Sequence, residues 1–246
     1  MANCEWALAA LPNALDLSVR PLKKSVNTPY SEFAPMMYGD TLYYSSFRYE
    51  NKADQVRPKR KVSKVLYSIR ASRGRPLPRK FNESEKHTAY ASLSPRGDRI
   101  YYSICEYLPN SLDIRCELVF RKKGKRKRWG KFQNLGEEVN LPGHTATHPQ
   151  VTYDEVLQKE VLYFVSDRPE GKGGLDIWRV ILKSNGKAGA VENLGALNTP
   201  EDEVAPFYYR PSQTLFFSSN GYPGFGNFDI YQAQFQPGEG WADPEN

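Results

Sequence analysis

Hydrophobic positions in this chain fall into short runs separated by turn-forming residues. β-branched and aromatic residues fill the runs, and Gly, Pro and Asn lie between them, a pattern typical of β-strands and turns. After Leu11, no apolar pattern with the period of a helix reaches three turns. The pattern predicts an all-β chain with one short helix, at its N-terminus within residues 1–14.

One run recurs four times, as two aromatic residues followed closely by serine. The four copies are Tyr43-Tyr44-Ser45-Ser46, Tyr101-Tyr102-Ser103, Tyr163-Phe164-Val165-Ser166 and Phe216-Phe217-Ser218-Ser219. Their second aromatic residues follow one another at intervals of 58, 62 and 53 positions. An Asp-Ile pair comes after a loop in the last three copies, at Asp113, Asp176 and Asp229. Such recurrence indicates a repeat architecture.

Each repeat is predicted to contain four antiparallel strands. In the last copy, apolar runs at 204–208, 215–219 and 228–235 are separated by turn residues, and another turn precedes Trp241. One four-stranded sheet leaves a face uncovered, so we expect the sheets to pack around an axis as a β-propeller. A β-sandwich also has short strands, but it does not require a recurring phrase. We expect a propeller domain over 15–246, with blades at about 27–81, 82–139, 140–197 and 198–246.

The chain resembles the WD-like, TolB-type propeller repeat family at these positions. The shared pattern is Asn-Thr-Pro, Glu-x-x-Pro, Leu-Tyr-(Tyr/Phe)-Ser-Ser and Asp-Ile-(Tyr/Trp), which fits residues 27–67 and 198–231 best. In envelope proteins of Bacteroidetes-type bacteria, including the PorE-type component of type IX secretion, such a propeller follows tetratricopeptide helices and often precedes an OmpA-type peptidoglycan-binding domain. Residues 3–11 look like the last helix of such a helical region. The first repeat lacks the Asp-Ile pair, and the sequence stops where Asn-Leu-Gly is expected, so we expect four of five to six blades of a longer protein.

The resemblance implies a non-catalytic interaction scaffold without cofactors, periplasmic and associated with the outer membrane. Its expected partners are other envelope or secretion-machinery proteins. Because propellers host unrelated functions, two alternatives stay open: a glycan- or peptidoglycan-binding propeller, and an accessory propeller of a hydrolase. No run of 18 apolar residues occurs, so no membrane span is predicted.

The net charge of +6 comes from one segment. The cations concerned are Arg121, Lys122, Lys123, Lys125, Arg126, Lys127, Arg128 and Lys131. We interpret the segment as a solvated hairpin tip. The alternative is binding of an anionic glycolipid through Arg126, Lys127 and Arg128. No nucleic-acid reading module accompanies it, so no nucleic-acid partner is predicted.

Two of the three cysteines lie on one predicted hairpin. Paired strands would bring Cys105 and Cys116 to about 5 Å, which leaves a disulfide or two buried thiols open. Zinc binding by the two cysteines is not favoured, because no second pair of ligands lies nearby in the sequence. Envelope relatives carry a similar pair, so the resemblance implies a disulfide and an oxidising compartment. Cys4 is interpreted as a helix-packing residue.

No catalytic or metal site is predicted. His144 and His148 have helical metal spacing, but on a strand they would lie about 13 Å apart. Asp113, Asp176 and Asp229 occur once per repeat and are interpreted as structural acceptors of loop N–H groups. Glycosidases need two carboxylates in one pocket, and nothing in the repeats pairs them.

We also make a prediction for each of two loops. The acidic loop 201–203 is expected to be solvated. In the Gly-rich loop 220–227, Tyr222 and Phe225 are expected to be exposed and to contact a partner, because exposed aromatic residues anchor interfaces.

Overall fold

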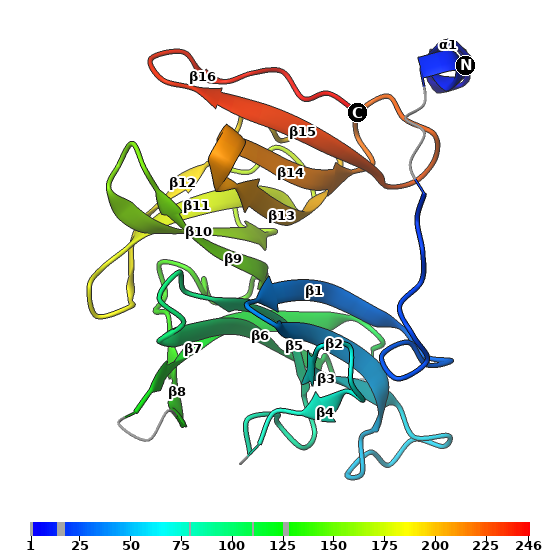
Figure 1. Ribbon diagram of the computed structural model, residues 1–246, viewed down its shortest axis with the longest axis vertical. Coiled ribbons are helices and arrows are strands. Elements are labelled where there is room, and N and C mark those ends of the chain that lie inside the picture. Colours follow the sequence, from blue (N-terminus) through cyan, green and yellow to red (C-terminus); the bar gives the residue numbers. More distant parts are fainter. Residues whose placement is uncertain (1, 14–17, 79, 110, 125–127) are drawn as a thin grey trace.

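The computed structural model describes residues 2–13, 18–78, 80–109, 111–124 and 128–246. They form four four-stranded antiparallel sheets, which we call blades 1 to 4, and one α-helix (Figure 1). Blade 1 contains β1 (Glu32–Tyr38), β2 (Thr41–Glu50), β3 (Lys61–Ile69) and β4 (Arg75–Pro76); blade 2 contains β5 (His87–Leu93), β6 (Arg99–Tyr107), β7 (Ile114–Lys123) and β8 (Trp129–Asn134). Blade 3 contains β9 (Ala146–Asp154), β10 (Lys159–Ser166), β11 (Asp176–Leu182) and β12 (Ala188–Asn193); blade 4 contains β13 (Glu203–Tyr209), β14 (Thr214–Ser219), β15 (Asp229–Gln236) and β16 (Gly240–Trp241). The helix is α1 (Ala2–Ala10), and 3₁₀ turns cover Leu11–Asn13 (η1) and Arg210–Ser212 (η2).

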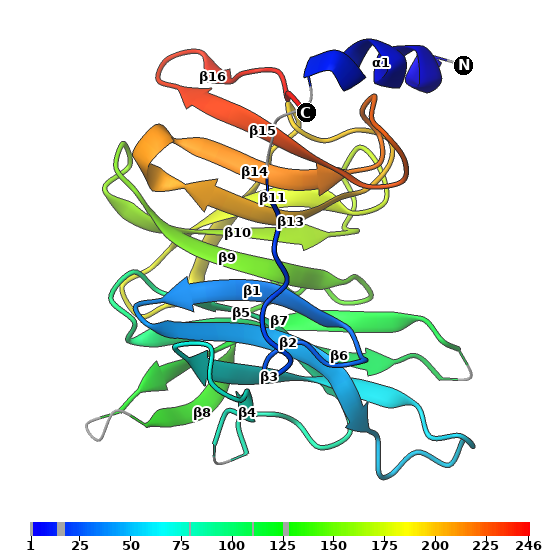
Figure 2. The same cartoon turned by 45° about the vertical axis from the view of Figure 1, so that its right-hand side comes forward.

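The blades follow one another around an axis, which confirms the predicted propeller. Within each blade, strands that are neighbours in sequence are neighbours in the sheet. The first strands of blades 2, 3 and 4 pack against the blade before: β5 on blade 1, β9 on blade 2 and β13 on blade 3. Figures 1 and 2 show these first strands nearest the middle of the molecule and the short fourth strands outermost.

The repeated aromatic pair has a packing reason. Side chains at successive strand positions point to opposite faces of a sheet, so each pair supplies one ring to each neighbouring blade. Tyr163, the first ring of blade 3, packs with Phe217, the second ring of blade 4. Its neighbour Phe164 packs in the opposite direction, with Tyr101 of blade 2. Pairing of this kind fills the cores between consecutive blades.

An asparagine clamp recurs at each junction between consecutive blades. The side-chain carbonyl of the asparagine accepts the N–H of one residue on the third strand, and its amide donates to the carbonyl of that residue. The pairs are Asn82 with Val65 (2.7 and 3.1 Å), Asn140 with Leu118 (2.7 and 2.8 Å), and Asn198 with Ile177 (2.8 and 3.0 Å). Because buried peptide groups need partners, the clamp lets the apolar faces close around these strands.

The acidic run 201–203, which ends on the first residue of β13, is not simply solvated, as the sequence suggested. Glu203 is fully buried, because the fold places donors around its carboxylate. The Thr199 N–H and hydroxyl each donate to it over 2.7 Å, and the Ser219 hydroxyl donates over 2.6 Å. Buried carboxylates are tolerated when they are hydrogen-bonded in this way.

Loss of a clamp should destabilise the propeller. Asn198→Ala leaves the buried Ile177 N–H without its acceptor, which should lower the free energy of unfolding by about 1–3 kcal/mol. The matched control is Asn27→Ala, because Asn27 holds the same place in its repeat but donates to the Leu22 carbonyl rather than to a strand. The control should change stability by less than about 0.5 kcal/mol. Urea unfolding of dilute protein measures both, and equal losses would contradict the clamp's role.

Candidate functional site

A cavity of about 680 Å³ lies where the inner strands of blades 1, 2 and 3 converge. This volume is within the range of ordinary ligand pockets. Its wall includes Phe33 of β1, Tyr90 of β5 and His148 of β9, while connecting loops contribute Leu112 and Leu175. The site is therefore built by several blades, and no single repeat contains it.

Two of the wall residues sit on β-bulges. All four inner strands have one residue with positive φ, next to a shift in strand register: Ala34 (51°), Tyr90 (55°), His148 (48°) and Ala205 (54°). Positive φ is uncommon outside glycine and costs energy, so its recurrence marks a feature of the repeat. Blades 2 and 3 place large side chains there, and the Tyr90 and His148 rings meet with centroids 3.9 Å apart.

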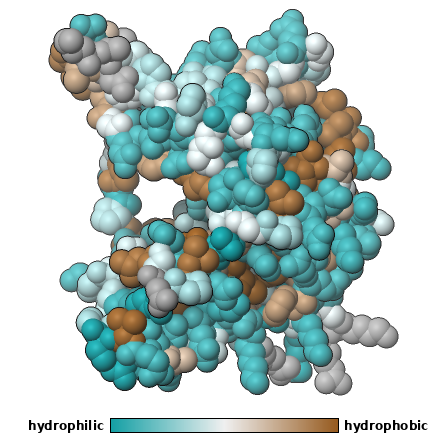
Figure 3. All heavy atoms as spheres, turned by 180° about the vertical axis from the view of Figure 1, so that it is seen from behind, coloured by the Kyte–Doolittle hydropathy of each residue, from teal (hydrophilic) through white to brown (hydrophobic). Residues whose placement is uncertain are grey.

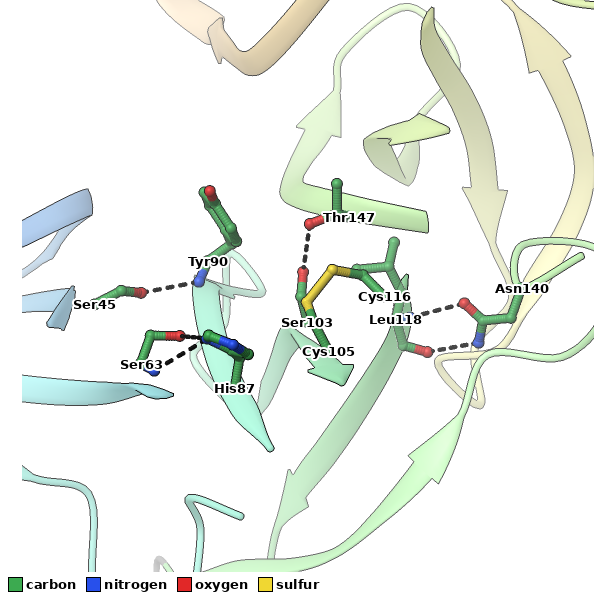
Figure 4. The surroundings of a disulfide bond; sticks show 10 residues. All are labelled: Ser45, Ser63, His87, Tyr90, Ser103, Cys105, Cys116, Leu118, Asn140 and Thr147. Carbon is green, nitrogen blue, oxygen red and sulfur yellow. Dashed lines mark hydrogen bonds between the residues drawn. A yellow bond between two sulfur atoms is a disulfide. The ribbon is translucent and has the colours of Figure 1, made fainter. Parts of the chain in front are cut away.

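Serine hydroxyls of the repeated phrase hold these inner strands in place (Figure 4). The Tyr90 N–H donates to Ser45 Oγ of the preceding blade over 3.0 Å. Ser103 Oγ lies 3.1 Å from Thr147 Oγ1, which is next to His148. The junctions between blades thus also position the cavity's side chains.

His148 presents a defined hydrogen-bond donor. Its Nδ1 accepts the N–H of Ala205 on blade 4 over 3.3 Å, so the neutral ring carries its proton on Nε2. Burial lowers the pKa of His148 to about 4, which keeps the ring neutral at pH 7. His148 therefore lines the cavity and also accepts a hydrogen bond from blade 4.

His87 lies deeper in the wall and is also neutral. It is 6% exposed, and it stacks on Phe47 with centroids 5.6 Å apart. Its Nδ1 accepts the Ser63 N–H over 3.2 Å (Figure 4), whereas its buried Nε2 has no partner among the described residues. Burial lowers the pKa of His87 to about 4.

A disulfide joins Cys105 on β6 to Cys116 on β7, in the same wall (Figure 4). The two residues are directly paired across the strands, with Cα atoms 4.0 Å apart. The bridge expected from the family resemblance is therefore present. Disulfides of this kind are typical of proteins outside the cytoplasm. Cys4 is a free, exposed cysteine, so its interpretation as a helix-packing residue was wrong.

The two acidic residues of the wall are engaged with backbone. Asp167 Oδ1 accepts the Thr145 N–H over 2.6 Å, and Asp202 Oδ1 accepts the Leu175 N–H over 2.8 Å. These bonds fix the loops that border the cavity. Within the described chain, no group of three or more His, Cys, Asp or Glu side chains has the arrangement needed to hold a metal ion.

The once-per-repeat aspartates lie outside the cavity wall and bond their own loops. Asp176 accepts the Lys172 N–H over 2.6 Å, and Asp229 accepts the Phe225 N–H over 2.7 Å. Asp113 instead accepts the Ser111 hydroxyl over 2.7 Å. Asp176 is fully buried, and this burial raises its pKa.

The Gly-rich loop 220–227 of blade 4 does not reach the cavity. Tyr222, expected to be exposed, is half-buried because its ring packs on Tyr231, with centroids 5.2 Å apart. Phe225 is 50% exposed and meets the ring of Trp6 in α1 edge-on, with centroids 5.3 Å apart. Its contact with a partner stays a prediction.

The basic segment covers the end of β7, the connection that follows and the start of β8, the third and fourth strands of blade 2. Arg126 and Lys127 lie outside the described residues, and Arg128 is exposed. Arg121, counted with this segment in the sequence, belongs to the interior instead. It is 7% exposed and donates to the Tyr102 hydroxyl over 2.7 Å and to the Gly130 carbonyl over 2.9 Å.

The sequence analysis did not predict that Tyr90 and His148 contact each other in the cavity wall. It considered His148 only as a metal ligand. The available signal was the inner-strand dipeptide ending in proline: Ala34-Pro35, His148-Pro149 and Ala205-Pro206 hold one repeat position. Two repeats have alanine at this position and one has His148. The histidine side chain is therefore not required by the repeat fold.

Comparison with known proteins supports the fold and leaves the activity open. No protein-family model and no curated protein sequence matches the chain. Similar solved structures include a thermostable family-43 glycoside hydrolase (TM-score 0.50, 13% identity, 90% of this chain and 74% of that one). Others are a luciferin-regenerating enzyme (0.51, 12%, 87% and 63%) and a GH43_12 retrieved from capybara gut metagenome (0.51, 14%, 90% and 42%). The chain thus spans less than two thirds of the last two, and at these identities the likeness shows the β-propeller fold alone.

Protonation of His87 should destabilise the protein in mild acid. Its pKa is about 4 in the folded protein and 6.5 in the reference state, so between these values the unfolded chain binds a proton that the folded chain does not. The free energy of unfolding should therefore fall as pH decreases through this window, by about 3 kcal/mol from His87. Urea unfolding at several pH values should show a shallower decline for His87→Gln. Slopes are compared, because the substitution lowers stability at every pH; parallel curves would contradict the assignment.

Proposed function

We propose that this chain is a non-catalytic binding module that uses the axial cavity to hold an apolar segment of a partner protein. The observation that carries the proposal is a cavity with a largely apolar wall and an exposed aliphatic border. Leu112 is 80% exposed and Ile114 is 47% exposed, and both line the cavity. Exposed aliphatic side chains gathered at a concave site are typical of interaction surfaces.

The polar groups of the cavity support orientation of a ligand better than chemistry on it. Both histidines are neutral at pH 7, and both carboxylates already accept backbone N–H groups. An acid catalyst of the glycosidase type would need a carboxyl group with a raised pKa beside a second carboxylate. The His148 Nε2–H is instead suited to donate one hydrogen bond to a carbonyl of the bound segment.

The cellular setting rests on two observations. The Cys105–Cys116 disulfide is typical of an oxidising compartment, and the repeats resemble the TolB-type propellers of envelope proteins. We place the protein in the periplasm in association with the outer membrane, with envelope or secretion-machinery proteins as partners. None of the described helices is long and apolar enough to cross a membrane.

A glycan is the second candidate ligand. Phe33, Phe47, Tyr90 and Tyr107 all line the cavity, and aromatic faces commonly stack on sugar rings. This candidate shares the site with the first and differs in the ligand. The two candidates are therefore separable by binding measurements on the same variants.

Peptides selected from a displayed library on the immobilised protein should bind through the cavity. Leu112→Asp should weaken their binding by about tenfold or more, since it places a charge on the apolar border. Val156→Asp is the matched control: Val156 is 52% exposed on the β9–β10 connection, and its substitution should leave the affinity unchanged. Isothermal titration calorimetry measures both variants.

Three other outcomes decide against this proposal. Equal peptide affinity of both variants would place binding elsewhere. Binding of oligosaccharides or peptidoglycan fragments, lost in Leu112→Asp, without any peptide binding would favour the glycan candidate. Hydrolysis of a glycoside by the wild type that is abolished in Asp167→Asn or Asp202→Asn would establish an enzyme.

A further inference from the structure

The basic segment of blade 2 is joined in space by a second one from blade 1. Residues 70–80 surround β4 and include Arg73, Arg75 and Lys80, all exposed. The buried guanidinium of Arg121 connects the two segments, because it donates to the Lys80 carbonyl over 3.2 Å and to the Gly130 carbonyl of β8 over 2.9 Å. Both ribbon views accordingly show β4 and β8 at the same edge of the molecule (Figures 1 and 2).

Chain length keeps the exposed cations of the two segments close to this connection. Arg75 is five positions before Lys80, and Arg128 is two positions before Gly130. Even a fully extended chain would place Arg75 within about 18 Å of Lys80, and Arg128 within about 7 Å of Gly130. Two blades therefore contribute to one surface, which we call the basic edge. Its cations are Arg73, Arg75, Lys80, Lys122, Lys123, Arg128 and Lys131.

The cations of the basic edge have no carboxylate partners among the described residues. Other cations of the chain do, as where Arg60 is paired with Asp54 over 2.7 Å. The acid beside the edge is Asp98, whose carbonyl accepts the Lys123 N–H over 2.7 Å, but its carboxylate accepts the Ser94 hydroxyl over 2.7 Å instead. Unpaired charges of one sign repel each other, and an anionic partner would relieve that repulsion.

Aromatic rings lie among these cations. The Lys123 ammonium is 4.8 Å from the centroid of the Trp129 ring, and Phe132 on the same strand, β8, is 46% exposed. The space-filling view shows hydrophilic side chains projecting from this part of the molecule, at the lower right (Figure 3). Cations gathered beside exposed rings are typical of proteins that lie on a membrane, where the rings enter the headgroup region and the cations stay among the phosphates.

We propose that the basic edge docks on an anionic lipid surface. Lipid phosphates then pair with the cations of both blades, and the Phe132 ring enters the headgroup region. A lipid surface fits better than a soluble polyanion, because a polyanion offers no apolar region for the exposed ring. The docking needs no membrane-spanning segment, and it goes beyond the proposed function because it does not depend on what the cavity binds.

The strand β7 fixes how a docked molecule would be oriented. Its first residue, Ile114, lines the cavity, and its last residue, Lys123, belongs to the basic edge. The nine positions between them correspond to about 30 Å along a strand. A molecule docked by the basic edge therefore keeps the cavity border away from the lipid, where it is open to a second protein.

Vesicle co-sedimentation tests the docking. The protein should bind phosphatidylcholine vesicles that contain about one third phosphatidylglycerol, and it should not bind pure phosphatidylcholine vesicles. Binding should weaken as sodium chloride rises from about 50 to 500 mM, because salt screens the charges. Absence of binding to the anionic vesicles at the lower salt concentration would overturn the proposal.

A charge-matched pair of triple variants locates the contact. Replacing Arg73, Arg75 and Lys80 together by Gln should weaken vesicle binding by about tenfold or more. The control replaces Lys52, Lys59 and Lys172 by Gln, which removes the same charge from the connections β2–β3 and β10–β11. All six side chains are exposed, so both variants should fold, which circular-dichroism melts check. Equal affinities of the two variants would contradict a basic edge built by two blades.

Phe132 distinguishes a lipid surface from a soluble polyanion. Phe132→Ser should weaken vesicle binding by about fivefold, while binding of poly-glutamate stays unchanged. Phe132→Leu keeps an apolar side chain and should bind vesicles nearly as the wild type does. If Phe132→Ser binds vesicles like the wild type, or loses poly-glutamate to the same extent, the partner is a polyanion and the lipid assignment is wrong.

Discussion

The structure depends on burial of one sheet face against the next, because no four-stranded blade can cover itself. Each fully buried large apolar side chain contributes about 1.5–3 kcal/mol, and each junction buries rings from two blades. This burial would leave the peptide groups of Val65, Leu118 and Ile177 without water. The asparagine clamps provide the replacement bonds. Apolar packing and hydrogen bonding are therefore satisfied together at each junction between consecutive blades.

The cavity follows from how the inner strands are made. A regular inner strand would alternate its side chains between the two junctions, but the bulge at each positive-φ residue interrupts that alternation. The unfavourable backbone is held by bonds across blades, from Ala205 to His148 and from Tyr90 to Ser45. Blades 1 and 4 have alanine at the bulge, whereas blades 2 and 3 have a large ring. The four blades thus share the bulge but differ in the side chain it carries, and the cavity wall uses the two rings.

Sequence patterns predicted the blades well because strand alternation and turn residues are local signals. They failed where the neighbours of a residue come from another strand or from another blade. Glu203 and Arg121 look solvated in sequence, yet partners up to 41 positions away allow both to be buried. Tyr222 looked like an exposed loop tip, yet its half-buried ring packs against the core between blades 3 and 4. The Tyr90–His148 pair is 58 residues apart; comparison of the repeats could mark His148, but its contact with Tyr90 depends on how the blades are arranged in space.

The cavity is built by three of the four blades. Every residue of the cavity wall belongs to blades 1 to 3 or to their connections, up to Asp202 just before β13. The cavity is thus formed by junctions that are complete within one chain. Blade 4 contributes no strand to the wall. Blade 4 still supports the wall, because the Ala205 N–H donates to His148 Nδ1.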